Sequence, residues 1–578
     1  MKLSKKTYWL LFGAILLLAA ILRFYKLGSV PVSLYWDEVA MLVDAKTVAA
    51  TGLDQHSRPW FQPIYPSYGD FKMPVYIWLA SISVKLFGVG EWQLRLPSAL
   101  AGLGTVVLVG LMAIELFCLG NEKSKVKSQK LIISLSAMLM VAISPWDIMF
   151  SRTGFEGHLA QFILGASAYL LLLSRKLERW WLILPATILA SLATYTYFSV
   201  RFVWPVLLII TILTSFRLPA EVVGTLIRNL LEKQNFIKFR NEFGITFLKL
   251  FLSLLLFYLA LIPMFKADLY AWSNQYRLST DSVLNCCAYA VQSNILREQA
   301  GNSLFERIIF HRDILLLKNL AHNYSKNLSL DFLFLTGDQN LRHGTGEHGL
   351  FSLVTLPLLI AGFYFLAKNN WRSWLILVTW WLISLLPASV PMDTPHALRT
   401  LNALIPISII FGFGLFTLIK SQKKLIVLIY FGLLFVSSFQ FSSHYFKYYK
   451  IDSASEWQDG YKQMATEIFA QKDEVQIVLV ESSLNRVNLW LMAYFLTPAQ
   501  IQNNKTDGFG VSRFENIYFD ENDWSKFFNE YDKILYVGSI SRLQEVLSQN
   551  KAFQTLEVKQ LVMFEAEKLV AAQLNKHE

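Results

Sequence analysis

The chain has 578 residues, of which 54% are hydrophobic and only 16% are charged, and its mean hydropathy is +0.39. A soluble domain this apolar would aggregate, so the composition excludes an ordinary water-soluble protein and predicts a chain that lipid solvates along most of its length. The net charge of +11 comes from Lys and Arg between apolar stretches, without the continuous basic stripe that nucleic-acid binding needs.

The first apolar stretch, residues 8–24, follows Lys5 and Lys6. The sequence Arg23-Phe24-Tyr25-Lys26 stands where a signal peptide would have a small-residue cleavage site, so we expect an uncleaved membrane span. Further stretches long enough to cross ~30 Å of hydrocarbon bring the expected total to about eleven transmembrane helices. The expected spans are residues 8–24, 96–119, 131–150, 159–173, 180–198, 202–216, 243–265, 350–367, 374–387, 397–419 and 425–441.

The apolar stretch Pro74–Phe87 decides the orientation, because counting it as a span would flip every later loop. If it does not cross, the basic segments all lie on one side, which the positive-inside rule identifies as the cytoplasm. These segments are residues 2–6, 123–130, 175–179, 217–240, 368–372 and 420–424. We therefore predict a multi-pass protein of the cell membrane with a cytoplasmic N-terminus, in which Pro74–Phe87 lies in the outer interface.

This orientation divides the chain into a transmembrane domain, residues 1–443, and an extracytoplasmic domain, residues 444–578. The main outer loops of the first domain are residues 25–95 and 266–349. In the second domain, buried strands are expected at residues 474–481 and 533–538, and amphipathic helices at 452–469 and 541–549. The predicted fold is therefore an α-helical polytopic membrane protein with a small C-terminal α/β domain. That domain has no glycine-rich phosphate loop, so no catalysis is assigned to it.

The predicted outer segments bring carboxylates and cations to one membrane face. Asp37 and Glu38 begin the first outer loop, and Lys72 and Arg95 stand near its end. Such a set suits a reaction on a lipid-borne phosphate, since cations hold the phosphate and a carboxylate takes a proton from the attacking group. Interfacial anchors and loop salt bridges would explain the same charges, and charge alone does not separate the two interpretations.

Several motifs, in their joint order and spacing, resemble one family of membrane enzymes. In the first half they are Tyr35-Trp36-Asp37-Glu38, Lys72-Met73-Pro74-Val75-Tyr76-Ile77-Trp78-Leu79, Lys85-Leu86-Phe87-Gly88 and Arg95-Leu96-Pro97-Ser98-Ala99-Leu100. Later come Leu335-Thr336-Gly337-Asp338-Gln339-Asn340-Leu341-Arg342-His343 and Pro395-His396-Ala397-Leu398-Arg399-Thr400-Leu401. The chain resembles the membrane glycosyltransferases of the GT-C fold, in the branch of protein O-mannosyltransferases, lipid A aminoarabinose transferases and related bacterial proteins.

The resemblance implies transfer of a sugar from a polyprenyl-phosphate donor to a protein, lipid or glycan acceptor at the extracytoplasmic face, with inversion. It makes Asp37 the general base, and Glu38 either an orienting group for the acceptor or a helix cap. It makes Lys72 and Arg95 contacts to the donor phosphate. The chain has Lys-Met-Pro where many relatives have Lys-Pro-Pro, which leaves the cation in place.

Further residues receive roles that stay open. Glu156, with Arg152, stands where relatives often have an aspartate, and is either a metal or phosphate contact or half of a local salt bridge. Asp338, Arg342 and His343 are candidates for acceptor binding or for a divalent ion, although a satisfied loop network explains them equally. Arg399 is a candidate third phosphate contact. No cofactor is certain, and a divalent metal is left open.

Two other functions are compatible with a polytopic membrane protein. A lipid or solute transporter, or flippase, would carry inverted repeats and ionisable residues in mid-span, whereas the charges here gather at the outer rim. A non-catalytic assembly scaffold would work through its C-terminal domain.

Overall fold

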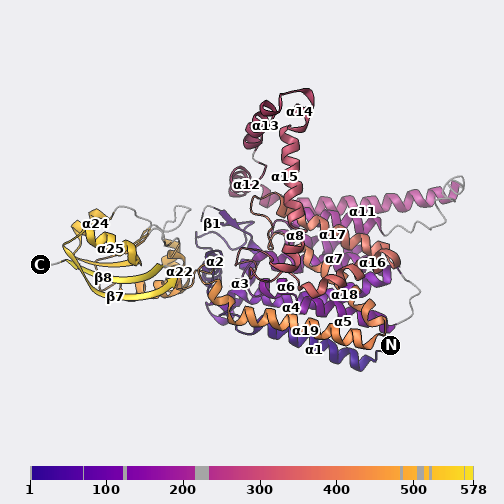
Figure 1. Ribbon diagram of the computed structural model, residues 1–578, viewed down its shortest axis with the longest axis horizontal. Helices are drawn as coiled ribbons and strands as arrows, with labels where there is room; N and C mark the ends of the chain where they lie inside the picture. The colour runs from indigo at the N-terminus through magenta and orange to yellow at the C-terminus, as the bar shows by residue number, and fades with distance from the viewer. Residues whose placement is uncertain are drawn as a thin grey trace. The chain divides into compact units, whose positions relative to one another are not determined.

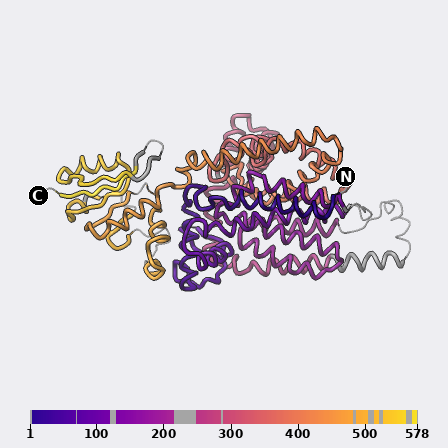
Figure 2. The backbone as a smooth tube through the Cα atoms, turned by 90° about the horizontal axis from the view of Figure 1, so that it is seen from below, coloured from indigo at the N-terminus to yellow at the C-terminus, as the bar shows by residue number. Residues whose placement is uncertain are grey.

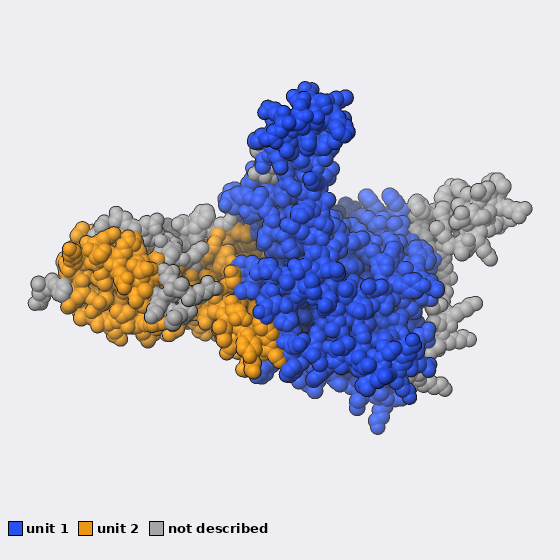
Figure 3. Space-filling model, viewed as in Figure 1, with its two compact units in different colours: residues 1–25, 98–151, 155–442 blue, residues 26–97, 152–154, 443–578 orange. Residues whose placement is uncertain are grey.

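The computed structural model describes residues 3–68, 70–120, 127–214, 233–284, 286–481, 484, 486–503, 513–519, 524–564 and 567–576 (Figure 1). Much of two segments predicted to be cytoplasmic, 123–130 and 217–240, lies outside these residues. The described chain forms two compact units, each assembled from separate stretches of sequence. Unit 1 comprises residues 1–25, 98–151 and 155–442, and unit 2 comprises residues 26–97, 152–154 and 443–578 (Figure 3).

Unit 1 is a helical bundle whose long members run alongside one another (Figures 1 and 2). Two of its helices, α4 and α19, continue into unit 2. The α-helices are α1 (Lys5–Phe24), α4 (Glu91–Gly120), α5 (Lys127–Ala142), α6 (Pro145–Phe150), α7 (Glu156–Lys176), α8 (Ile183–Thr194), α9 (Val200–Leu213), α11 (Lys233–Phe265), α12 (Asp268–Thr280), α13 (Cys286–Ala300), α14 (Leu304–Ile309), α15 (Arg312–Lys326), α16 (Leu356–Asn369), α17 (Trp371–Ser389), α18 (Leu404–Lys420) and α19 (Lys424–Lys447). Single turns of other helix types are η1 (Trp180–Leu182), η2 (Asp331–Leu335), η3 (Leu353–Thr355) and η4 (Leu401–Ala403).

The chain is a multi-pass membrane protein, and every predicted span overlaps at least one helix. Among the described residues, 7 helices are long and apolar enough to cross a membrane, and several shorter apolar helices accompany them. The predicted span 131–150 is divided, because α5 ends at Ala142 and α6 begins at Pro145. Ser144 caps the new helix, and proline at its first position needs no hydrogen-bond donor there.

The centre of unit 1 is α18, which is buried along most of its length. Glycines let its neighbours approach closely. A Cβ at Gly412 would collide with Ala137 of α5, and a Cβ at Gly362 of α16 would collide with the backbone at Ile410 of α18. Small residues at such crossings are how membrane helices gain packing contacts that lipid cannot supply.

The predicted outer loop 266–349 is mostly helical. It contains α12, α13, α14 and α15, and α13 to α15 form an arm that projects from the bundle of unit 1 (Figure 1). After the arm, η2 and an irregular segment return the chain to α16. Hydropathy could not predict the arm, because its helices are too polar to be identified as membrane spans. The sequence defined the segment 266–349 only as the loop between two apolar spans.

Unit 2 combines the predicted first outer loop with the C-terminal residues. From the loop come α2 (Trp36–Thr51), the antiparallel pair β1 (Tyr65–Ser67) and β2 (Asp70–Lys72), and α3 (Pro74–Phe87). From the C-terminal residues come α20 (Tyr449–Asp452), α21 (Tyr461–Gln471), β3 (Ile477–Val480), α22 (Asn488–Tyr494), α23 (Pro498–Asn503), β4 (Arg513–Phe514), β5 (Ile517–Tyr518), α24 (Ser525–Glu530), β6 (Lys533–Ser539), α25 (Ile540–Gln549), β7 (Phe553–Phe564) and β8 (Glu567–Lys576).

The C-terminal strands form a mixed sheet in the order β4-β5-β3-β6-β8-β7. The apolar strands predicted at 474–481 and 533–538 are the parallel pair β3 and β6, in register from Ile477 opposite Ile534. The helix predicted at 541–549 is α25, whose Leu543 and Val546 are buried against this sheet. The helix predicted at 452–469 begins only at α21, because Gly460 adopts φ 88°, a left-handed conformation that interrupts a helix.

Polar contacts tie the two parts of unit 2 together. Lys46 of α2 donates to the carbonyls of Met492, Ala493 and Leu496 at the end of α22, at 3.1, 2.8 and 2.6 Å. Glu91 accepts from Lys462 at 2.7 Å. A cation against the last carbonyls of a helix is stabilising, so α2 and the C-terminal segment support each other's position.

Candidate functional site

Asp37 and Lys72 meet in an ion pair within unit 2. Asp37 lies in the first turn of α2, and Lys72 ends β2, just before the proline that begins α3. The ammonium of Lys72 donates to Oδ1 of Asp37. The side chain of Lys72 is 13% exposed, and that of Asp37 is 24% exposed. The structure therefore brings together the predicted base and the predicted phosphate contact, and leaves both accessible.

Arg486 joins this pair from the C-terminal residues, where sequence reasoning assigned no role. Its guanidinium lies 3.5 Å from the ring centroid of Trp36, and Lys72 Nζ lies 5.9 Å from the same ring. Nη1 of Arg486 is buried and has no hydrogen-bond partner. Burial lowers the pKa of Arg486, and the carboxylate of Asp37 is the strongest charge acting against that effect. The site thus holds two cations beside one carboxylate.

Glu38, the adjacent acid, has an opposite environment. Its carboxylate and Arg95 form a fully buried, two-pronged ion pair with both contacts at 3.0 Å. Glu38 also accepts from the backbone N–H of Gly154 at 2.5 Å and of Tyr35 at 3.2 Å. The Tyr35 bond is the helix-capping arrangement that the sequence left open for Glu38.

Arg95 has no donor left for a ligand in this arrangement. Besides the two bonds to Glu38, its nitrogens donate to backbone carbonyls of Leu27 at 3.4 Å, Pro31 at 3.0 Å and Ser33 at 2.5 Å. A guanidinium has five N–H groups, and these five bonds use them all. The predicted contact between Arg95 and a donor phosphate therefore stays a prediction that this geometry does not favour.

Arg152 and Glu156 belong to different units. Arg152 is fully buried in unit 2, where Nη2 donates to the carbonyls of Lys26 and Val30 at 3.0 Å and the guanidinium lies 4.8 Å from the ring of Phe446. Glu156 begins α7 of unit 1 and is half-buried. Arg152 thus pins the backbone before the cis peptide at Pro31.

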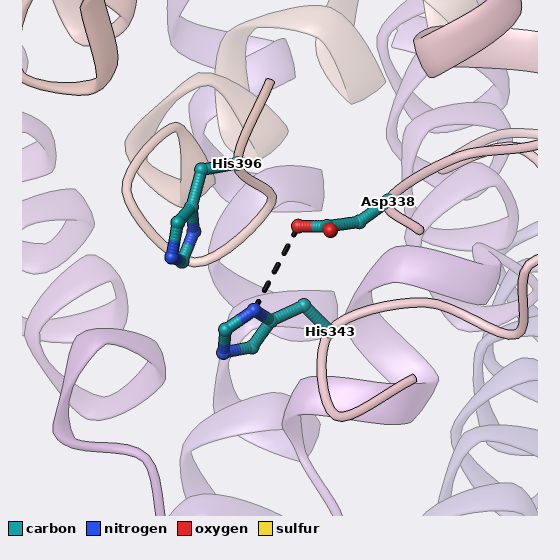
Figure 4. A group of neighbouring side chains, drawn as sticks. All are labelled: Asp338, His343 and His396. Carbon is teal, nitrogen blue, oxygen red and sulfur yellow. Dashed lines mark ion pairs between the residues drawn. The ribbon is translucent and has the colours of Figure 1, made fainter. Parts of the chain in front are cut away.

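A second group of candidate site residues lies in unit 1. Asp338 and His343 come from the segment after η2, and His396 comes from the segment before η4 (Figure 4). His343 Nδ1 lies 3.8 Å from Asp338 Oδ2, and the two histidine rings are 4.5 Å apart between centroids. His343 also stacks on Phe150 at 6.1 Å. The predicted acceptor-binding residues Asp338 and His343 are therefore neighbours, and His396 is a member that the sequence did not single out.

Burial governs the ionisation of this group. It raises the pKa of Asp338 to about 6, against the effect of backbone hydrogen bonds from Ala397 and Asn340. It lowers the pKa of His343 to about 3, and the charges of Arg342 and Arg399 act in the same direction. At neutral pH the site therefore presents neutral imidazole and a largely ionised carboxylate.

Arg342 and Arg399 flank this group and are each half-buried. Nε of Arg342 donates to Asn340 Oδ1 at 3.0 Å, and Nη1 of Arg399 donates to the carbonyl of Asp393 at 3.1 Å. Both arginines lie close enough for their positive charges to lower the pKa of His343 and of His396.

A buried network at the edge of α1 was not anticipated. Arg23 donates to Asp147 at 2.5 and 3.1 Å, and His158 lies 3.3 Å from the other carboxylate oxygen. Ser98 completes it, 3.2 Å from His158 Nδ1. All of these side chains are fully buried, so the network ties α1, α4, α6 and α7 together and offers no open face to a substrate.

No protein-family model and no curated protein matches the chain. Solved structures do. ArnT from Cupriavidus metallidurans bound to undecaprenyl phosphate is 12% identical, with a TM-score of 0.50 and 98% of each chain covered. The oligosaccharyltransferase AglB from Archaeoglobus fulgidus, in complex with an inhibitory peptide and a dolichol-phosphate, is 12% identical, with a TM-score of 0.48 over 92% of this chain and 69% of that one. The likeness to ArnT extends along the whole chain, and it establishes that this protein has the GT-C fold that the sequence motifs predicted.

Proposed function

We propose that this protein transfers a sugar from a polyprenyl-phosphate donor to a protein, lipid or glycan acceptor, with inversion at the anomeric carbon. The observation that carries the proposal is the accessible ion pair of Asp37 and Lys72, supplemented by Arg486. The GT-C fold supports it, since the similar ArnT structure holds undecaprenyl phosphate.

The proposed chemistry follows the movement of charge. When the bond between the sugar and the phosphate breaks, the anomeric carbon becomes oxocarbenium-like and the phosphate gains negative charge. Lys72 and Arg486 stabilise that charge, so the leaving group needs no acid. Asp37 accepts the proton of the acceptor hydroxyl or amine as the new bond forms.

The Asp37–Lys72 contact gives the donor a way to activate the base. A donor phosphate is a competing partner for the ammonium of Lys72, because both ligands are oxyanions. When the phosphate takes that place, Asp37 loses its hydrogen-bond donor and can accept a proton. Acceptor activation would then depend on donor binding, because Asp37 is released from Lys72 only when a donor phosphate occupies the site.

The second phosphate partner in this proposal is Arg486 rather than Arg95. Arg486 has a nitrogen without a hydrogen-bond partner beside Trp36, whereas the nitrogens of Arg95 are all engaged within unit 2. Arg95 acts as a positioning residue that fixes Glu38 and, through the first turn of α2, Asp37. The site is proposed to face the extracytoplasmic side, on the strength of the positive-inside pattern.

The proposal is tested by comparing the glycolipids and glycoproteins of cells that carry the wild type or D37N, using mass spectrometry. The matched control is D268N, which removes an exposed carboxylate from the first turn of α12. We expect one sugar modification to disappear with D37N and to persist with D268N, at equal membrane levels of protein. An unchanged profile with D37N, together with uptake or flipping of a labelled substrate by proteoliposomes, would favour a transporter instead.

A further inference from the structure

The cluster of Asp338, His343 and His396 has the composition of a metal site. Two imidazoles and one carboxylate are a donor set that proteins use for zinc and related divalent transition metals. The three residues come from two segments separated by α16 and α17, so the fold rather than the local sequence gathers them (Figure 4). One ligand atom of each lies within 4.8 Å of the others.

The histidines carry nitrogens that the protein leaves unsatisfied. Nδ1 of His343 and Nδ1 of His396 are buried and have no hydrogen-bond partner. Only 9% of His343 and 6% of His396 is exposed. A buried polar atom without a partner costs free energy, so two of them beside a carboxylate indicate a ligand that completes the site.

The spacing fits an ion after a small contraction. His343 Nδ1 lies 3.8 Å from Asp338 Oδ2. Donor atoms around a tetrahedral ion with bonds of about 2.0 Å lie roughly 3.3 Å apart. The required contraction is about half an ångström for this pair and at most about 1.5 Å for any pair, which side-chain rotation on two irregular segments can supply.

Surrounding contacts hold the ligands in place. The carboxylate of Asp338 accepts from the backbone N–H of Asn340 at 3.0 Å and of Ala397 at 2.7 Å, which links it to the segment that carries His396. The backbone N–H of His396 donates to Asn327 Oδ1 at 3.3 Å. A Cβ on Gly344 would collide with the backbone of Asp338, so this turn needs glycine to close around the site. Such outer contacts fix ligand orientation in metal sites.

We propose that Asp338, His343 and His396 bind one divalent transition-metal ion of the zinc class. Three protein ligands leave a fourth position for water or for an anionic oxygen ligand. The flanking cations Arg342 and Arg399 weaken attraction for a bare ion and favour an anion in that fourth position. The site lies within unit 1, and the inference stands or falls independently of the sugar transfer proposed for unit 2.

The test uses full-length protein purified in detergent through a tag without histidines. After chelator treatment and equilibration with Zn²⁺, bound metal is counted by elemental mass spectrometry on the monodisperse fraction. We expect about one ion per wild-type chain, and affinity reduced by about tenfold or more in H343Q and in H396Q. The control H322Q removes an exposed histidine of α15 and should bind as the wild type does.

A second measurement needs no variant and covers the case in which the ligand variants fail to fold. X-ray absorption at the zinc edge of the loaded wild type should report two imidazole nitrogens with oxygen in the remaining positions, at about 2.0 Å. Less than about a tenth of an ion per chain, equal binding by wild type and both ligand variants, or a spectrum without imidazole would each overturn the proposal.

Discussion

Asp37 and Glu38 are adjacent in sequence, share the first turn of α2, and each pairs with a cation from the same predicted loop, yet their surroundings differ completely. Asp37 and Lys72 are partly exposed and joined by a single contact. Glu38 and Arg95 are fully buried, with every N–H of the arginine engaged. The two pairs contain the same kinds of charged group, so burial rather than residue type decides their roles. A partly exposed pair can exchange its partner for a ligand, whereas a buried pair holds the backbone in place. Variants at the two pairs should therefore fail in different ways.

The largest expected effect on activity is that of D37N. Asparagine keeps the shape and the first-turn position but cannot accept a proton, so transfer should fall by about 10²- to 10⁴-fold. Folding should be unaffected, because the partly exposed contact to Lys72 contributes little to stability. Turnover in proteoliposomes and thermal unfolding of the same preparation measure the two effects. If D37N lowered the unfolding temperature clearly, the Asp37–Lys72 pair would be structural like the Glu38–Arg95 pair, and the proposed difference between them would be wrong.

E38Q should show the reverse behaviour. Removing one partner leaves the Arg95 charge buried and uncompensated, which destabilises a protein by about 3–5 kcal/mol. We expect a clear fall in the unfolding temperature and reduced accumulation in membranes. E298Q, the same change at an exposed glutamate of α13, is the matched control. A stable and fully active E38Q would show that the buried pair is not structural.

K72A should mainly weaken donor binding. The variant removes one of two cations proposed for the phosphate and also frees Asp37 permanently, so KM for the lipid donor should rise by about tenfold or more while kcat falls less. Steady-state kinetics at varied donor concentration separate the two constants. If kcat alone fell, Lys72 would act in the chemical step rather than in binding.

R486Q should give a similar but smaller rise in KM. Its guanidinium is shared with the ring of Trp36, so only part of its interaction energy is available to a ligand. R542Q, at a partly exposed arginine paired with Glu545 on α25, is the matched control among the C-terminal residues. If R486Q and the wild type had equal kinetics, Arg486 would not be the second phosphate contact, and Arg95 and Arg399 would remain as candidates.

The sequence predicted the positions of the membrane helices well because hydropathy is a local property, and each predicted span overlaps at least one helix. It failed where a single residue interrupts a helix that the hydrophobic pattern continues, as at Pro145 and Gly460. Asp37 and Lys72 were predicted as a site through motifs near each other in the chain. Arg486 and His396 were missed as site residues, because only contacts far apart in sequence bring them to their partners.

The same limitation applies to Arg95. Nothing in the sequence separates an arginine that meets a ligand from one that meets backbone carbonyls, since both follow the same motif. The C-terminal residues were likewise predicted to form their own domain, whereas α22 and α21 contact the first loop within unit 2. Deleting residues 447–578 would therefore remove Arg486 and the support of α2, so loss of activity would not by itself indicate a scaffold.

The most direct test of the central claim measures the donor itself. Polyprenyl phosphates extracted from membranes that contain wild type or D37N can be quantified by liquid chromatography and mass spectrometry. The account predicts that a sugar-linked polyprenyl phosphate accumulates with D37N and is consumed with the wild type, while the free polyprenyl phosphate changes in the opposite direction. Equal levels of the sugar-linked lipid in both membranes, at equal protein content, would contradict it.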